Sequence, residues 1–89
     1  MEQLTCIVCG YQPEYAIPGD ADINQPYKAT AFITQGHYGS TFFDPMDGSH
    51  LEINVCDECL NKAVDKKQIL IYNSGNRIPE VYERGKHER

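Results

Sequence analysis

Several features of a large, self-sufficient domain are missing from this sequence. It has no tryptophan, and no run of apolar residues is longer than four, as in Ile69-Leu70-Ile71-Tyr72. A membrane-spanning helix needs about 20 apolar residues, so no such helix is expected. The N-terminus, Met-Glu-Gln-Leu-Thr-Cys, lacks the basic region and apolar stretch of a secretory signal. We therefore expect a cytoplasmic protein without membrane contact.

Basic residues are also scarce. The chain has 8 Lys and Arg against 13 Asp and Glu, which gives a formal net charge of −5. Binding four thiolates to one divalent metal would change the charge to about −7, because the thiols lose four protons and the metal adds two charges. Non-specific nucleic-acid binding relies on a basic patch, so this charge disfavours it. The charge instead suits a basic partner surface.

The chain is short, with 89 residues of which 40% are apolar. A single domain of this size buries only about 60% of its unfolded surface, so it usually needs a disulfide, a metal or a partner subunit. Four cysteines are available for that role: Cys6, Cys9, Cys56 and Cys59. In a reducing compartment, paired cysteines indicate metal ligands more than disulfides, which remain the alternative.

The cysteines form two C-x-x-C pairs, a spacing that suits a tetrahedral Zn²⁺ site. Gly10 follows the first pair and permits the positive φ that lets the chain turn back. No glycine follows Cys56-Asp57-Glu58-Cys59, and the apolar spacing of the next residues predicts a helix that begins on this pair. We expect a structural Zn²⁺, with iron as the alternative. Four filled positions leave none open for catalysis.

The fold class expected is a small α+β metal-stabilised domain: a Cys knuckle, an antiparallel β-hairpin or three-stranded sheet, and then one helix. Alternating or β-branched residues predict the strands, and Gly-containing segments predict the turns. The expected strands are 28–35, 40–44 and 50–55, with turns at 36–40 and 44–49. For residues 69–72 we expect a short strand that packs on the hairpin, with a last turn of the helix as the alternative. We expect one zinc-binding domain over residues 1–73 and a polar C-terminal tail over residues 74–89.

This order of knuckle, hairpin and ligand pair on the first helical turn resembles the treble-clef and zinc-ribbon type of four-cysteine zinc finger, over roughly residues 4–67. The resemblance implies zinc but no single function, since these folds bind nucleic acids and proteins alike.

Two narrower resemblances concern parts of the chain. The stretch HYGSTFFDPMDGSHLEINVCDECL is similar to a motif of small uncharacterised bacterial and phage zinc-binding proteins, which brings no known activity. The first knuckle, CIVCGYQPEY, is similar to the first Cys loop of rubredoxins. Rubredoxins repeat a Pro and a Gly around their second Cys pair. The second pair of this chain departs from that pattern, since it has Asp57, Glu58 and Leu60 instead. An iron electron carrier is therefore the less favoured interpretation.

No nucleophile, base and orienting group stand together in the sequence, so we do not expect an enzyme. The histidines His37, His50 and His87 are interpreted as exposed or turn residues. We expect a non-enzymatic binding module that acts as adaptor or regulator through protein–protein contact, and a homodimer is possible. A nucleic-acid-associated regulator is the alternative, supported by the basic cluster of the tail over residues 74–89 together with Lys62, Lys66 and Lys67. The candidate partner-binding residues are Tyr11, Tyr15, Tyr38, Arg77, Tyr82 and Arg84.

Overall fold

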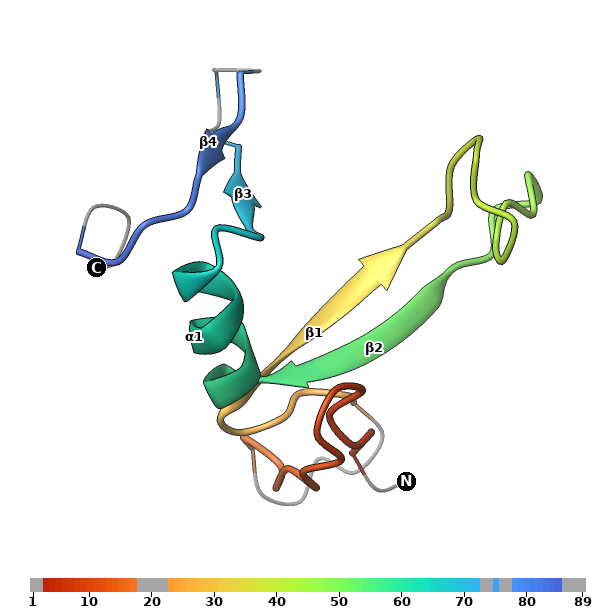
Figure 1. Ribbon diagram of the computed structural model, residues 1–89. Helices are drawn as coiled ribbons and strands as arrows, with labels where there is room; N and C mark the ends of the chain where they lie inside the picture. The colour runs from red at the N-terminus through yellow and green to blue at the C-terminus, as the bar shows by residue number, and fades with distance from the viewer. Residues whose placement is uncertain (1–2, 18–22, 73–74, 76–77, 86–89) are drawn as a thin grey trace. The chain divides into compact units, whose positions relative to one another are not determined.

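The computed structural model describes residues 3–17, 23–72, 75 and 78–85 of the chain. It shows a small α+β protein with two small antiparallel sheets and one helix, in the order β1, β2, α1, β3, β4 (Figure 1). The chain divides into two compact units, residues 1–57 (unit 1) and 58–89 (unit 2). The boundary expected after residue 73 falls inside unit 2, next to residues outside the described ranges.

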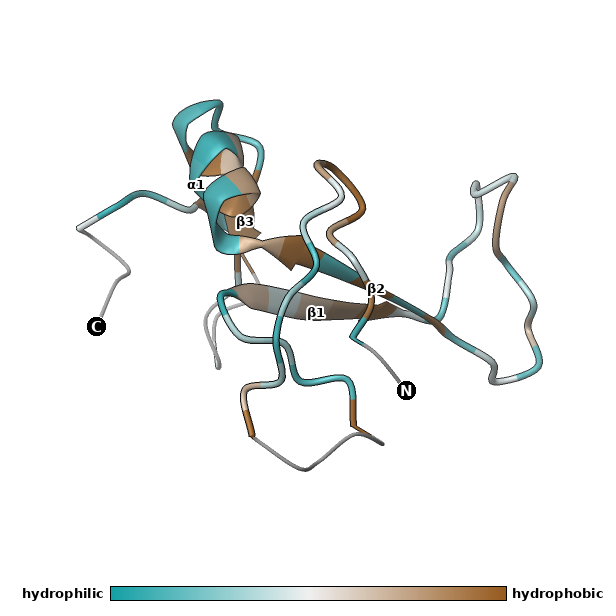
Figure 2. Ribbon diagram, turned by 90° about the horizontal axis from the view of Figure 1, so that it is seen from below, coloured by the Kyte–Doolittle hydropathy of each residue, from teal (hydrophilic) through white to brown (hydrophobic). Residues whose placement is uncertain are grey.

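Unit 1 contains the antiparallel pair of β1 (Ala29–Thr34) and β2 (Leu51–Cys56). Phe32 lies opposite Ile53, and Ala29 lies opposite Cys56. Both strands are rich in β-branched residues, which favour extended backbone, and Figure 2 shows hydrophobic residues along each of them. The strands predicted at 28–35 and 50–55 are therefore confirmed.

The strand predicted at 40–44 was wrong, because this segment folds into side-chain-stabilised turns. The Ser40 hydroxyl accepts hydrogen bonds from the amides of Phe42 and Phe43, at 3.2 and 3.0 Å. A β-carbon on Gly36 would collide with the Phe43 carbonyl oxygen, so the chain passes very close to itself. These local bonds replace a strand ladder. Within the described residues, the cysteine pairs are thus separated by two strands.

The N-terminal segment of unit 1 lies along β2, joined by a parallel bridge between Cys6 and Asn54. The most buried side chains of the described residues include Cys6, Cys56, Gln3 and Asn54, with 2%, 4%, 3% and 1% exposure. Because side chains alternate along a strand, Leu51, Ile53 and Val55 share one face of β2 and Asn54 lies on the other. The N-terminal segment covers Asn54, while Ile53 stays 37% exposed. Thiols and amides are therefore prominent in the buried centre of unit 1.

Helix α1 (Asp57–Asp65) begins directly after Cys56, as predicted. The acidic residues at its first positions are stabilised by the positive end of the helix dipole. Leu60, Ala63 and Val64 are half-buried. At its end, the amide of Gln68 donates to the Ala63 carbonyl and that of Lys67 to the Val64 carbonyl, both at 3.0 Å. This pair of bonds is a Schellman motif, with Lys67 in the left-handed conformation at φ 57°.

The rest of unit 2 forms a second sheet from β3 (Leu70–Ile71) and β4 (Glu80–Val81). The short strand predicted at 69–72 exists, but its described strand partner is β4 and not the hairpin. Its partner strand comes from the segment expected as a polar tail. Among the described residues, no helix has the length and apolar character needed to cross a membrane.

Candidate metal centre

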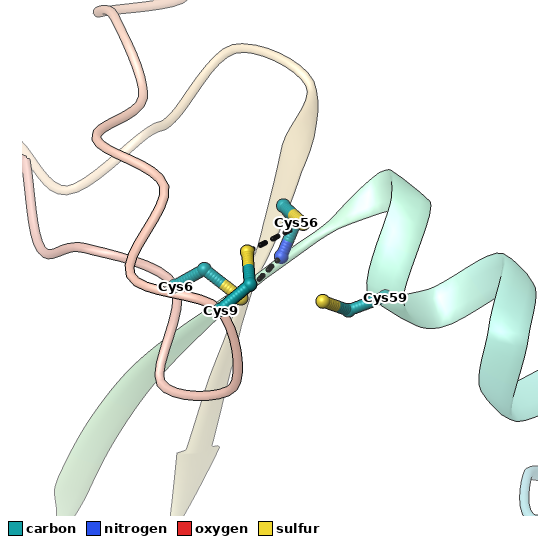
Figure 3. A group of neighbouring side chains, drawn as sticks. All are labelled: Cys6, Cys9, Cys56 and Cys59. Atoms are coloured by element: carbon teal, nitrogen blue, oxygen red, sulfur yellow. Dashed lines mark hydrogen bonds between the residues drawn. The ribbon is translucent and has the colours of Figure 1, made fainter.

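The four cysteine thiols come together at one point, as Figure 3 shows. Their sulfur atoms all lie within 4.8 Å of one another. The sulfurs of Cys9 and Cys56 are 3.6 Å apart. Sulfurs at the corners of a tetrahedron with metal–sulfur bonds of about 2.3 Å are about 3.8 Å apart, so this spacing fits a metal ion. The four cysteines predicted from the sequence are therefore a group that could hold a metal.

The first pair sits on a tight turn whose backbone bonds are closed locally. The amide of Gly10 donates to the Cys6 carbonyl at 2.9 Å, and the amide of Cys6 donates to the Tyr11 carbonyl at 2.8 Å. Gly10 has a φ of 81°, a conformation that a side chain would strain. The sequence indicated this role for Gly10, and the turn brings the thiols of Cys6 and Cys9 to the same side.

The sulfur of Cys6 accepts backbone hydrogen bonds from both parts of the site. The amide of Cys56 donates to it at 3.3 Å. This bond, followed by those from the amides of Cys9 and Val8, lowers the pKa of the Cys6 thiol from 9.0 to about 6. A large fraction of Cys6 is therefore thiolate at neutral pH, which is the form that binds metals.

The second pair is held by the junction of a strand and a helix. Cys56 ends β2 and is buried, and Cys59 lies on the first turn of α1. The first amides of a helix have no partner within the helix, so they stabilise negative charge nearby. A helix that begins on two thiols is therefore suited to hold them as thiolates.

Asn54 holds the two polypeptide segments of unit 1 together, a role that the sequence patterns did not predict. Its side-chain amide donates to the Leu4 carbonyl at 2.9 Å, and its backbone carbonyl accepts from the Ile7 amide at 3.0 Å. Its side chain and that of Asn24 also bond each other in both directions, at 2.8 and 3.0 Å. One signal was present: Asn54 precedes Cys56 by two residues and so shares its strand face.

The two described histidines, His37 and His50, are not part of the cluster. Within the described part of the chain, the four cysteines are the only group of three or more His, Cys, Asp or Glu side chains that could hold a metal. The His37 ring nitrogen Nδ1 lies 3.1 Å from the Tyr38 carbonyl oxygen, and both His37 and His50 have side chains outside the buried centre. His87 lies outside the described residues.

The candidate partner-binding residues lie in different surroundings. Tyr38 is 96% exposed in the connection between β1 and β2, and Tyr11 is 41% exposed after the first knuckle. Tyr15 is half-buried and bridges to Pro26. Tyr82 is half-buried beside β4, and its amide donates to the Ile69 carbonyl. Tyr11, Tyr15 and Tyr38 belong to unit 1, and Tyr82 belongs to unit 2.

The two arginines of that set differ. The guanidinium of Arg84 lies 3.3 Å from the Asp65 carboxylate and donates to the Asn61 carbonyl at 2.9 Å, so it fastens the end of unit 2 to α1. Arg77 lies outside the described residues.

No protein-family model, curated protein or solved structure matches this chain. The functional interpretation therefore rests on the geometry of the site and on the surface around it.

Proposed function

We propose that this protein is a non-enzymatic, zinc-stabilised binding module that acts as adaptor or regulator through protein–protein contact. The observation that carries the proposal is the closed group of four thiols, with sulfurs within 4.8 Å of one another. Thiolates favour soft or borderline metals, and four of them at tetrahedral spacing favour Zn²⁺. Because all four positions would be filled by protein, the metal would serve the fold.

The order of elements supports a treble-clef-like arrangement within this proposal. A knuckle at Cys6 and Cys9 is followed by the antiparallel pair β1–β2, and Cys59 lies on the first turn of α1. The small buried centre adds a physical reason, because few apolar side chains of the described residues are withdrawn from water. Metal binding can supply the folding free energy that such a centre lacks.

Protein contact is supported by the connection between β1 and β2. Tyr38, Phe42 and Met46 are 96%, 88% and 92% exposed there. The connection is nevertheless ordered: Ser40 organises one turn, and the Asp47 carboxylate accepts bonds from the amide and hydroxyl of Ser49, at 2.9 and 2.6 Å. Large apolar side chains held in water on an ordered loop are typical of a binding surface.

Contact with a second copy belongs to the same proposal. Among the described residues, β1 pairs only with β2, so its other edge is open. Its sequence, ATAFIT, has no charged residue or proline, which are the usual protections of an edge strand. Light scattering would show whether the protein is a dimer in solution.

The proposal is tested by metal content and by partner capture. Elemental analysis should find one zinc per chain, and capture with the wild-type protein should retain a protein that the Tyr38→Ser variant loses. Ile17→Ser, at another exposed apolar residue, should leave capture unchanged. A purified protein that contains no zinc after anaerobic preparation would contradict the proposal, and a red iron-loaded form would favour the rubredoxin-like alternative.

A nucleic-acid-associated regulator is the second candidate, favoured by the charge of unit 2. That unit has seven basic and five acidic residues, and Lys62, Lys66 and Lys67 are exposed on or just after α1. Salt-dependent retardation of DNA or RNA, weakened by the triple substitution of these lysines with glutamine, would favour this function.

A further inference from the structure

A surface cavity of about 230 Å³ lies in unit 1, and none of the four cysteines lines it. It opens between the N-terminal segment and the strand β2. Its lining residues come from these two segments alone: Leu4, Thr5, Ile7, Glu52, Ile53 and Asn54.

The cavity exists because the two segments pair at one point and then separate. Among the described residues, the bridge between Cys6 and Asn54 is the only β-pairing of this segment with β2, and the Ile7 amide bonds to Asn54 beside it. The Leu4 carbonyl accepts its bond from the Asn54 side chain at 2.9 Å, in place of a ladder bond from β2. A fully buried amide thus fixes the separation of the two walls, and the cavity is part of the fold.

The walls combine apolar surface with one acidic group. Leu4, Ile7 and Ile53 are 40%, 64% and 37% exposed, which leaves apolar area in contact with water. Glu52 is exposed at the same cavity and supplies a carboxylate. A long side chain with an aliphatic stem and a cationic head fits this combination, because the stem covers apolar surface while the head stays at the acidic rim.

The charge of unit 1 indicates the same kind of partner. It contains eight acidic residues, and its only basic residue is Lys28. Such a charge attracts basic segments over distances of about 10 Å at moderate salt. We propose that the cavity receives a lysine or arginine side chain from a basic segment of a partner protein. This inference rests on the proposed function, since it names the class of partner that the module binds.

The test uses the isotope-labelled, metal-loaded full chain and small probes followed by NMR. The probes are N-acetyl-lysine methylamide and N-acetyl-arginine methylamide. We expect saturable shifts of the Thr5, Ile7 and Ile53 amides with at least one of the two, and the tighter of the two identifies the preferred head group. Two further probes with the same capped backbone separate the contribution of the aliphatic stem from that of the cationic head. The norleucine derivative has the stem without the charge, and the 2,3-diaminopropionate derivative has the charge without the long stem.

Substitutions assign the effect to the cavity. Glu52→Gln should weaken binding of the cationic probe by about two- to fivefold, the range of an exposed ion pair. Glu14→Gln removes the same charge from another exposed position of unit 1 and should have no such effect. Ile7→Ser should weaken binding, while the neighbouring exposed Val8→Ser should not, because Val8 does not line the cavity.

Each outcome decides between the two proposals. Shifts with the norleucine probe equal to those with the cationic probes, or shifts scattered over the acidic residues, would overturn this inference. The proposed function would still stand if the protein contains one zinc per chain. Absence of zinc would instead overturn the proposed function, whatever the cavity does. Every variant is compared by zinc content and spectrum with the wild-type chain before its binding is interpreted.

Discussion

The backbone amide of Cys56 donates a hydrogen bond to the sulfur of Cys6 at 3.3 Å, across 50 positions of the sequence. It is the largest contribution that lowers the pKa of the Cys6 thiol to about 6. The bond joins β2 to the N-terminal knuckle and favours the charged thiolate. The stability of this contact within unit 1 therefore depends on pH.

The zinc-loaded protein should lose stability in acid. The Cys6 pKa is lowered on folding from 9.0 to about 6, and metal binding needs the thiolate, so the stabilising effect of this group is complete above pH 9. The effect should decline as the pH falls towards 6, and below that value protons also compete with the metal for the sulfur. Denaturant titrations of the zinc-loaded protein at a series of pH values should show this decline, with release of zinc measured beside it. A stability that stays constant through and below pH 6 would contradict the assignment.

Removal of the metal should largely unfold the domain. The described residues bury few apolar side chains, so we expect metal–thiolate bonds to supply much of the folding free energy. A strong chelator, or Cys59→Ser, should abolish the cooperative thermal transition followed by circular dichroism. His50→Ser is the matched control, because His50 lies outside the cluster. Unchanged thermal unfolding after verified metal removal would refute this prediction.

Asn54→Leu should destabilise the fold by about 2–4 kcal/mol. The substitution leaves the Leu4 carbonyl and the Asn24 amide without the partners that Asn54 provides, and buried polar groups are costly when unpaired. Chemical denaturation would measure the change. Asn61→Leu, at an exposed position of α1, should change stability by less than about 0.5 kcal/mol. Equal effects of the two substitutions would argue against this structural role for Asn54.

Lys67→Gly should make the protein more stable by about 1 kcal/mol. Lys67 closes α1 in the left-handed conformation, at φ 57°, where a β-carbon is strained and glycine is not. Lys66→Gly removes the same charge one residue earlier, outside that conformation, and should not stabilise. The two midpoints of denaturation give the comparison, and a Lys67→Gly variant no more stable than Lys66→Gly would argue against the Schellman motif.

Gly36→Ala should cost about 2 kcal/mol or more. Its φ of 80° is unfavourable for alanine, and the added methyl group would collide with the Phe43 carbonyl oxygen. Gly48→Ala has a similar φ, 87°, but meets nothing within 4 Å, so it should cost only about 1 kcal/mol. The difference between these variants in thermal unfolding isolates the close approach from the backbone strain.

Local patterns predicted the parts of the fold that depend on neighbours in sequence. The spacing of the cysteine pairs, the glycine after Cys9 and the apolar residues after Cys59 each act over a few positions. For that reason the knuckle and the start of α1 were predicted correctly. The segment 40–44 has strand-forming residues, but the Ser40 hydroxyl accepts hydrogen bonds from two of its backbone amides. These local bonds outweigh the strand propensity of the segment.

The sequence by itself determined the candidate metal ligands, the two main strands, the helix and the acidic charge, because these follow from residue types at short spacing. The tertiary structure alone decided that Asn54 is buried and Ile53 is not, that β3 pairs with β4, and that a cavity opens beside Glu52. Each of these depends on contact between segments distant along the chain. Alternation along a strand gives its two faces, and only the segment that packs against it decides which face is buried.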